Sequence, residues 1–449
     1  MQYRVLVYIA FLIWTGFCFA GNPHPAVEQV KTPNILILSV DTLRSDRLSA
    51  YGYERPTSPN IDRLLARGLR FERARTVEPL TAPACISMLT ALYPHEHGSS
   101  RNGVPMLPDL SSLPKLLRAQ GYATAAFVSN WTLRTKLTGL GEHFDHYGEV
   151  FTRKRWFGML LSEATAEDIS ENAATWLNHR DREKPFLLWA HYSEPHAPYR
   201  FHRKFAGRLG IPKQEKATQS DRYDTEIAFT DLQIQLLLDR LEEEGVIDDT
   251  LIVFLSDHGE SLGEHRYWGH GRNLYEPCLR IPMGLIWPGV IEPGTVYRAP
   301  AMNLDIPPTL LGLMNMPIPH HYRGFDWSAV IRGNSPPPTT RTTYHQAHRG
   351  AVQSLKAAER GRRRGLLEVG ILSGGVKESL RVRSQTLRLF DLENDAAELA
   401  NLAPRKSKPS KALETWALEV ERGLNQASEN DLHLADEDLE MLRSLGYID

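Results

Sequence analysis

Three stretches of the chain consist almost entirely of hydrophobic residues. They span residues 34–40, 186–190 and 250–256 and are rich in Ile, Leu, Val and Phe. Uninterrupted apolar runs of this length are typical of strands buried on both faces, as in a parallel sheet covered by helices. The polar residues Asp41, His191 and Asp257 follow these runs directly. Because ligands bind outside the carboxyl ends of strands in open α/β sheets, the three runs predict one site at a single edge.

Segments with apolar residues at helical spacing lie between these runs. We expect helices over residues 61–68, 110–121, 164–180 and 221–245, some of which close on a glycine. Alternation of strands and helices predicts an α/β fold with a doubly wound sheet. Residues 335–340 read Ser-Pro-Pro-Pro-Thr-Thr, and beyond them come a basic segment, a predicted hairpin and an amphipathic helix. We therefore predict a main domain over residues 33–330 and a smaller C-terminal subdomain over residues 331–449.

The beginning of the chain has the pattern of a secretion signal. Arg4 precedes an apolar run over residues 5–13, and small or aromatic residues continue to Ala20. The run is shorter than the roughly 20 residues that span a bilayer. We predict that residues 1–20 are a cleaved signal peptide and that the protein is exported, to the periplasm or outside the cell. An uncleaved signal anchor is the alternative, and it would be the only expected membrane contact.

Composition and charge narrow the class of protein. With 42% hydrophobic and 24% charged residues, the chain resembles an ordinary globular enzyme rather than a disordered or coiled-coil protein. The formal net charge of -2 gives no reason to expect nucleic-acid binding. Beyond the signal, Cys85 and Cys278 could pair or stay free, and nothing in their spacing decides between these states.

Acidic and imidazole side chains after the predicted strands suggest a metal site. Asp41 follows the first strand, and Asp257 and His258 follow another. Carboxylate and imidazole groups are ligands for zinc and for harder divalent cations. A single Asp after a strand is more often a turn former or an N-cap. Two such acids, one of them followed by His, favour the metal site.

Four motifs carry a resemblance to a known family. Residues 34–46 read Asn-Ile-Leu-Ile-Leu-Ser-Val-Asp-Thr-Leu-Arg-Ser-Asp, and residues 80–98 read Leu-Thr-Ala-Pro-Ala-Cys-Ile-Ser-Met-Leu-Thr-Ala-Leu-Tyr-Pro-His-Glu-His-Gly. Residues 256–265 read Ser-Asp-His-Gly-Glu-Ser-Leu-Gly-Glu-His, and residues 268–271 read Trp-Gly-His-Gly. In this order and spacing they resemble successive motifs of the sulfatase family. Residues 390–395 and 401–403 are similar to the family's C-terminal signature. The resemblance implies an alkaline-phosphatase-like α/β/α sandwich whose catalytic domain covers residues 33–330.

The chain departs from the sulfatase motifs where sulfate is held and attacked. Sulfatases carry Cys-x-Pro-Ser-Arg, or Ser in place of Cys, and alignment on Pro83 places Thr81 at the nucleophile and Cys85 at the arginine. Threonine cannot become formylglycine, because its β-carbon carries a methyl group. Where sulfatases have Gly-Lys-Trp-His, residues 129–132 read Ser-Asn-Trp-Thr, so the lysine and the histidine are replaced. At the position of a later catalytic lysine this chain has His270.

With these departures, the chain resembles the threonine-nucleophile branch of the superfamily, which includes phosphodiesterases and phosphoethanolamine transferases. That resemblance implies a set of site residues: metal ligation by Asp41, Thr81, Asp257 and His258, catalysis by Thr81, His196 and His270, and substrate binding by Asn102 and Asn130. In that branch the two histidines assist the leaving group or hold a second metal. Alternatives remain open, because Thr is also a good N-cap and Asn-Gly at residues 102–103 is also a turn sequence.

We therefore predict a metal-dependent hydrolase that cleaves phosphate esters with Thr81 as nucleophile. Two other functions stay open: a sulfatase that uses unmodified threonine, and a non-catalytic relative that binds a ligand. The metal is predicted to be zinc, manganese, magnesium or calcium. The expected substrate is an ester of a small molecule, a glycan or a lipid.

Overall fold

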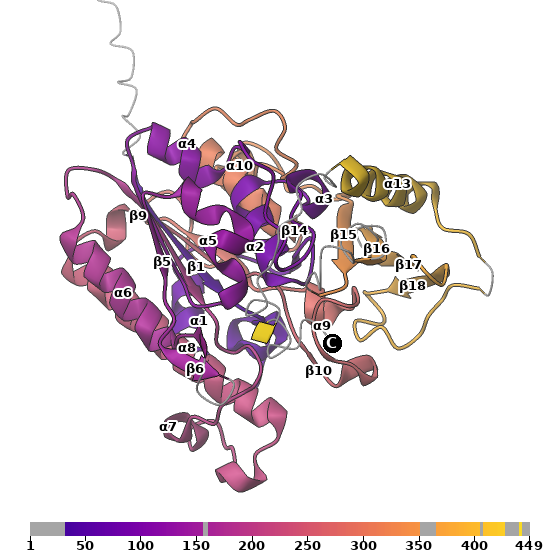
Figure 1. The fold of residues 1–449 in the computed structure, drawn as a ribbon, viewed down its shortest axis with the longest axis horizontal. Coiled ribbons are helices and arrows are strands. Elements are labelled where there is room, and N and C mark those ends of the chain that lie inside the picture. The colour runs from indigo at the N-terminus through magenta and orange to yellow at the C-terminus, as the bar shows by residue number, and fades with distance from the viewer. Residues whose placement is uncertain (1–31, 156–159, 351–364, 405–406, 427–439, 442–449) are drawn as a thin grey trace, which may run out of the picture. The chain divides into compact units, whose positions relative to one another are not determined.

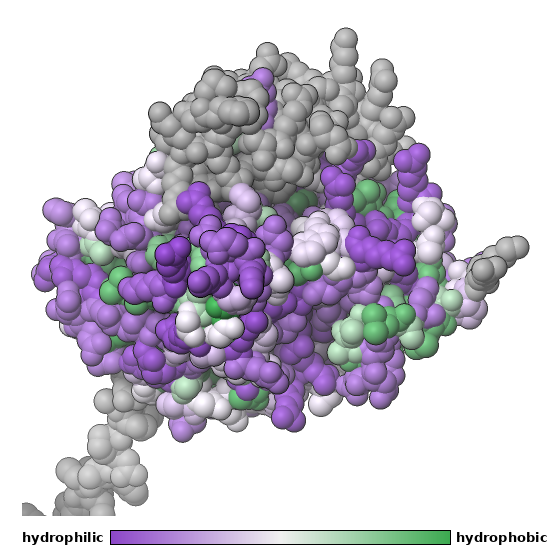
Figure 2. All heavy atoms as spheres, turned by 90° about the horizontal axis from the view of Figure 1, so that it is seen from below, coloured by the Kyte–Doolittle hydropathy of each residue, from purple (hydrophilic) through white to green (hydrophobic). Residues whose placement is uncertain are grey.

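The computed structural model describes residues 32–155, 160–350, 365–404, 407–426 and 440–441. The predicted signal peptide lies outside these residues. Among the described helices, none combines the length and the hydrophobicity needed to cross a membrane. On the face shown in Figure 2, hydrophilic residues predominate and hydrophobic ones occur in small groups.

The core of the fold is a sheet of eight strands in the order β13-β2-β12-β9-β1-β8-β4-β5. Its centre holds the three predicted strands, β1 (Asn34–Val40), β8 (Phe186–Tyr192) and β9 (Thr250–Ser256). β1 pairs in parallel with both neighbours. β4 (Ala123–Val128) and β5 (His146–Glu149) extend the sheet in parallel on the β8 side.

The other edge of the sheet is mixed, which the hydrophobic pattern does not predict. β12 (Met283–Ile286) pairs antiparallel with β9 and with β2 (Leu69–Phe71), and β13 (Thr295–Tyr297) pairs in parallel with β2. A parallel neighbour requires a crossover, usually a helix. The connection from β9 to β12 holds only short elements, of which the longest is the four-residue helix α9 (Glu276–Leu279), and the chain returns in the opposite direction.

Helices cover both faces of the sheet because alternate side chains of β1 point to opposite sides. Leu36 and Leu38 pack in one buried cluster with α1 (Pro59–Ala66), α6 (Ala166–His179) and α8 (Gln219–Glu243). Ile35 and Ile37 pack in another with α2 (Thr81–Thr90), α4 (Leu113–Ala119) and α10 (Ile306–Leu313). Figure 1 shows α6 and α8 on one side of the sheet and α2, α4 and α10 on the other. The predicted α/β sandwich and the four predicted helices are therefore confirmed.

A second, four-stranded antiparallel sheet follows in the last quarter of the chain. It consists of β15 (Thr343–His348), β16 (Leu366–Ser373), β17 (Val376–Arg381) and β18 (Thr386–Asp391). The amphipathic helix α13 (Lys411–Gln426) packs against it, beside β16 in Figure 1. Buried Lys377 of β17 joins this sheet to the main body through an ion pair with Glu276 of α9, and it also pairs with Glu398, which follows β18.

Candidate metal centre and active site

The candidate site lies where the central parallel strands end. Val40 pairs with both Ser256 and Tyr192, so the residues that follow these positions emerge at the same edge of the sheet. Asp41 and Asp257 are the next residues of β1 and β9, and both are buried. The backbone N–H of Asp41 donates to the carbonyl of Tyr192 at 2.9 Å, which fixes the end of β1. The predicted convergence of the two acids follows from this register.

Helix α2 brings Thr81 to the same place. The helix begins at Thr81, and all ten of its residues are buried. The N-cap position belongs to Leu80, and no side chain caps it. The Thr81 hydroxyl lies 3.3 Å from Nε2 of His258. The hydroxyl therefore contacts the strand-end cluster instead of capping its own helix.

His258 joins the nucleophile candidate to both carboxylates. Its Nδ1 donates to the carbonyl of Gly259 at 2.9 Å, which leaves a lone pair on Nε2. That nitrogen lies 3.7 Å from Oδ1 of Asp41 and 3.5 Å from Oδ2 of Asp257. Burial lowers the pKa of His258 to about 4, so the imidazole is neutral at physiological pH. A neutral imidazole with a lone pair directed at two carboxylates is a suitable metal ligand.

The donor set fits a divalent cation. Asp41, Asp257 and His258 each offer a ligand atom, and these atoms lie within 4.8 Å of one another. Oδ1 of Asp257 accepts from the backbone N–H groups of Thr42 at 3.2 Å and His258 at 2.7 Å. Its Oδ2 is buried and has no hydrogen-bond partner among the described residues. Burial raises the pKa of Asp257 to about 7, so its ionised form needs a positive charge nearby.

Two asparagines predicted to bind substrate support the centre from its sides. The side-chain amide of Asn130 donates to Oδ2 of Asp41, and its Oδ1 accepts from Thr132. Oδ1 of Asn102 accepts from the backbone N–H of Ala82 at 3.0 Å, in the first turn of α2. Both asparagines are buried. Their contacts position Asp41 and the start of α2, and substrate binding by either one stays a prediction.

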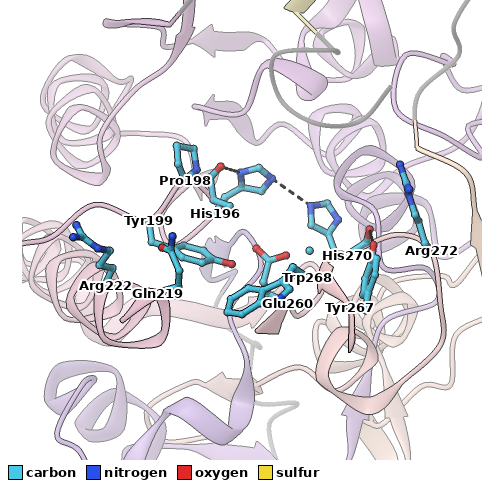
Figure 3. A pocket seen from close by; sticks show the side chains of 12 residues that line it. His196, Pro198, Tyr199, Gln219, Arg222, Glu260, Tyr267, Trp268, His270 and Arg272 are labelled. Atoms are coloured by element: carbon cyan, nitrogen blue, oxygen red, sulfur yellow. Dashed lines mark hydrogen bonds between the residues drawn. The ribbon is translucent and has the colours of Figure 1, made fainter. Parts of the chain in front are cut away.

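His196 and His270 face each other at the open side of the centre (Figure 3). Their Nε2 atoms lie 3.3 Å apart. Nδ1 of His196 donates to the carbonyl of Ala197 at 2.7 Å, and Nδ1 of His270 donates to the carbonyl of Pro79 at 3.2 Å. Each Nε2 then carries a lone pair in the neutral state. Two facing lone pairs are favourable only with a proton or another electrophile between them, so the pair suits proton transfer.

A cleft of about 950 Å³ opens beside the two histidines. Its lining includes His196, His270, Tyr199, Glu260 and Trp268, whose side chain is 57% exposed. Figure 3 shows the Tyr199 hydroxyl directed towards the Glu260 carboxyl group. Burial raises the pKa of Glu260 to about 8, although the hydrogen bond from Tyr199 acts in the opposite direction. The cleft wall thus offers a buried carboxyl group with a raised pKa and an exposed aromatic surface.

Some residues of the site were not assigned by sequence reasoning. Glu260 stands two residues after His258, and the position alone gives no sign that it is buried in the cleft wall. His191 is the next-to-last residue of β8, and its Nε2 lies 4.0 Å from Oδ2 of Asp41. Cys85 lies one turn after Thr81 and close to Asp257. The position of His191 directly after the apolar run of residues 186–190 was the available signal, whereas the contacts of Cys85 depend on how α2 packs.

Comparisons with known proteins agree with this architecture. The sulfatase family profile matches residues 33–316. An N-acetylglucosamine-6-O-sulfatase of Bacteroides thetaiotaomicron is 23% identical, over 84% of this chain and 82% of its own. A choline-sulfatase of Rhizobium meliloti is 26% identical, over 84% of this chain and 83% of its own. The structure of a phosphonate monoester hydrolase of Agrobacterium radiobacter has a TM-score of 0.69 at 19% identity, covering 90% of this chain and 99% of that one. The sulfatase-like and alkaline-phosphatase-like fold is confirmed.

The geometry of the centre predicts that divalent-metal binding depends on Asp257. Replacing Asp257 by Asn removes the charge of a buried ligand while keeping its shape, and it should abolish stoichiometric metal binding. Elemental analysis after dialysis and titration calorimetry with Zn²⁺, Mn²⁺, Mg²⁺ and Ca²⁺ measure this. Asp248, whose side chain is 81% exposed, provides the matched control Asp248→Asn. Unchanged metal content in Asp257→Asn would contradict the assignment.

Proposed function

Because the chain belongs to the sulfatase family, we propose that it is a metal-dependent hydrolase that cleaves monoanionic sulfate esters with Thr81 as nucleophile. The proposal depends chiefly on the contact of the Thr81 hydroxyl with Nε2 of His258, at 3.3 Å, beside two buried carboxylates. The curated relatives, which are sulfatases, support the choice of a sulfate ester. The prediction that phosphate esters are the main substrates lacks this support.

In the proposed reaction the residues of the centre bind the ester and orient the nucleophile. A divalent cation held by Asp41, Asp257 and His258 would supply positive charge that favours the alkoxide form of Thr81 and offsets charge on the ester. The contact with His258 holds the Thr81 oxygen at the centre. Attack forms a bond from the Thr81 oxygen to sulfur and breaks the bond from sulfur to the leaving alcohol oxygen.

The His196 and His270 pair would handle the protons of both steps. When the pair holds a proton between its two Nε2 atoms, it gives this proton to the leaving oxygen, and both histidines line the cleft. A water molecule then returns a proton to the pair and attacks sulfur, releasing sulfate and restoring Thr81. Because the alcohol leaves on the cleft side, Tyr199, Glu260 and Trp268 would contact this part of the substrate. A small molecule, a glycan or a lipid alcohol remains the proposed leaving group.

The charges of the centre favour a monoanionic ester over a dianionic one. Two carboxylates balance one divalent cation, and Asn130 and Cys85 stand where the sulfatase motifs have Lys and Arg. A sulfate monoester carries one negative charge, whereas a phosphate monoester carries up to two at neutral pH. The centre therefore offers little compensation for a second negative charge.

Phosphodiesters and phosphonate monoesters form a second substrate candidate. They are also monoanions, so they satisfy the same charge limit. Thr81 itself favours them, because threonine cannot supply the aldehyde hydrate that sulfatases use to eject sulfate. The fold likeness to a phosphonate monoester hydrolase is compatible with this candidate.

We also propose that the protein is exported. The support is the charged residue, apolar run and small residues at the start of the sequence. N-terminal sequencing of the mature protein tests this, and an intact first residue in protein recovered from the exporting host would contradict cleavage.

The role of Thr81 predicts a strict requirement for a hydroxyl group at this position. Thr81→Ala should lower kcat by about 10³-fold or more, whereas Thr81→Ser should retain activity. Initial rates with sulfate, phosphonate, phosphodiester and phosphate-monoester substrates that share one aryl leaving group measure this. Sulfate should be cleaved fastest and the dianionic phosphate monoester slowest.

Several outcomes would overturn the assignment of Thr81. Full activity in Thr81→Ala would exclude Thr81 as nucleophile. Activity that requires coexpression with a formylglycine-generating enzyme would contradict catalysis by an unmodified threonine. A metal-loaded wild-type protein that is inert on all four esters would favour a non-catalytic binding function.

The histidine pair predicts a dependence on the leaving group. His196→Ala and His270→Ala should each lower kcat by about 10² to 10⁴-fold with an alkyl ester, because the alkoxide needs a proton. The loss should shrink with a nitrophenyl ester, whose anion leaves unprotonated. Exposed His179 on α6 provides the control His179→Ala. Equal losses for both esters, or a lowered melting temperature with normal kcat, would assign the pair a structural role.

A further inference from the structure

Cys85 lies beside the candidate nucleophile on the same buried face of α2. Cys85 comes four positions after Thr81, about one helical turn, so the two side chains lie on one side of the helix. Cys85 is fully buried and forms no disulfide with Cys278. A buried free cysteine most often serves as a small hydrophobic residue. What distinguishes Cys85 is the polar environment that its sulfur meets.

His191 provides a second potential ligand atom close to Cys85. It lies on the central strand β8, is fully buried, and its Nδ1 is 2.8 Å from Oγ of Ser39. Ser39 has two lone pairs, enough to accept both the Nδ1–H of His191 and the indole N–H of Trp189, which is 2.8 Å away. In that arrangement Nε2 of His191 carries a lone pair. This nitrogen is buried and has no hydrogen-bond partner among the described residues.

Asp257 completes the group and connects it to the first centre. Ligand atoms of Cys85, His191 and Asp257 lie within 4.8 Å of one another, and all three residues are buried. Asp257 also belongs to the group with Asp41 and His258. One carboxylate, with a buried oxygen that lacks a partner, thus lies between two sets of potential ligands.

We propose that Cys85, His191 and Asp257 form a second cation subsite, adjoining the Asp41, Asp257 and His258 site and sharing the Asp257 carboxylate. Thiolate and imidazole donors select a thiophilic ion such as Zn²⁺ over Mg²⁺ or Ca²⁺, which prefer oxygen ligands. The inference rests on the proposed metal-dependent function, because the two sites share Asp257.

Cobalt substitution tests the subsite directly, because Co²⁺ bound to a thiolate gives a near-ultraviolet charge-transfer band and Co²⁺ bound only to oxygen and nitrogen does not. The metal-free full-length protein is titrated with Co²⁺ and followed by absorbance, and Zn²⁺ content is measured by elemental analysis. We expect about two equivalents of metal per chain and a charge-transfer band. Cys85→Ser should lose the band and about one equivalent. Cys278→Ser, which changes the other buried cysteine, should keep both.

The outcomes separate the subsite from the proposed function. The wild-type protein could bind one equivalent of Co²⁺, seen by its visible absorption bands, without a charge-transfer band. That result would overturn the subsite and leave the first metal site intact. No Co²⁺ binding at all would overturn both. A band that persists in Cys85→Ser would assign it to another cysteine and overturn the subsite. If Cys85→Ser unfolds, His191→Gln tests the same subsite, because it should weaken the binding of the second equivalent of Co²⁺. The charge-transfer band of the wild-type protein tests the subsite without any variant.

Discussion

The parallel pairing of β1 with β8 and β9 fixes the positions of the carboxylates at the centre. The register places Val40 beside both Tyr192 and Ser256, so one strand end delivers Asp41, the next delivers Asp257 and His258, and the third leads to the loop that carries His196. A slip of one residue along β1 would turn Asp41 to the opposite face, because side chains alternate along a strand. Continuous hydrophobic packing on both faces of these strands prevents such a slip.

Burying two carboxylates at one strand edge costs free energy, and the surrounding groups offset only part of it. Asn130 donates to Asp41, and two backbone N–H groups donate to one oxygen of Asp257. The other oxygen of Asp257 lacks a partner among the described residues, and burial raises the pKa of this group. An isolated buried charge is costly unless it is paired or coordinates a metal. A bound cation would therefore stabilise the ionised carboxylates of the centre better than the surrounding side chains do.

The sequence predicted those features that depend on strand ends and local periodicity. The apolar runs located β1, β8 and β9, and helical spacing located α1, α4, α6 and α8, with bounds shifted by a few residues. Asp41 and Asp257 could be placed at one edge because the carboxyl ends of parallel strands meet at the same edge of a sheet, whereas the pairing of β1 with β9 is known only from the structure. Thr81, His196 and His270 entered only through the family resemblance. The antiparallel strand β12, the Asn130 contact with Asp41 and the approach of Cys85 to His191 depend on tertiary packing, which one sequence does not encode locally.

Residues 81 and 85 lie about one helical turn apart, so both differences from the family motif affect the same local environment. Threonine at position 81 excludes the aldehyde chemistry of the family, and cysteine at position 85 removes the guanidinium group that the family motif places beside the nucleophile. An unmodified hydroxyl group is a weak nucleophile and needs positive charge close to its oxygen. Since no arginine supplies that charge from α2, the proposed mechanism takes it from a divalent cation held by the strand-end carboxylates and His258. Fully buried His258 and His191 are both neutral, because burial lowers their pKa values, and neutral imidazoles leave the positive charge to the metal. The replacement of arginine and the proposed dependence on metal thus concern the same local environment.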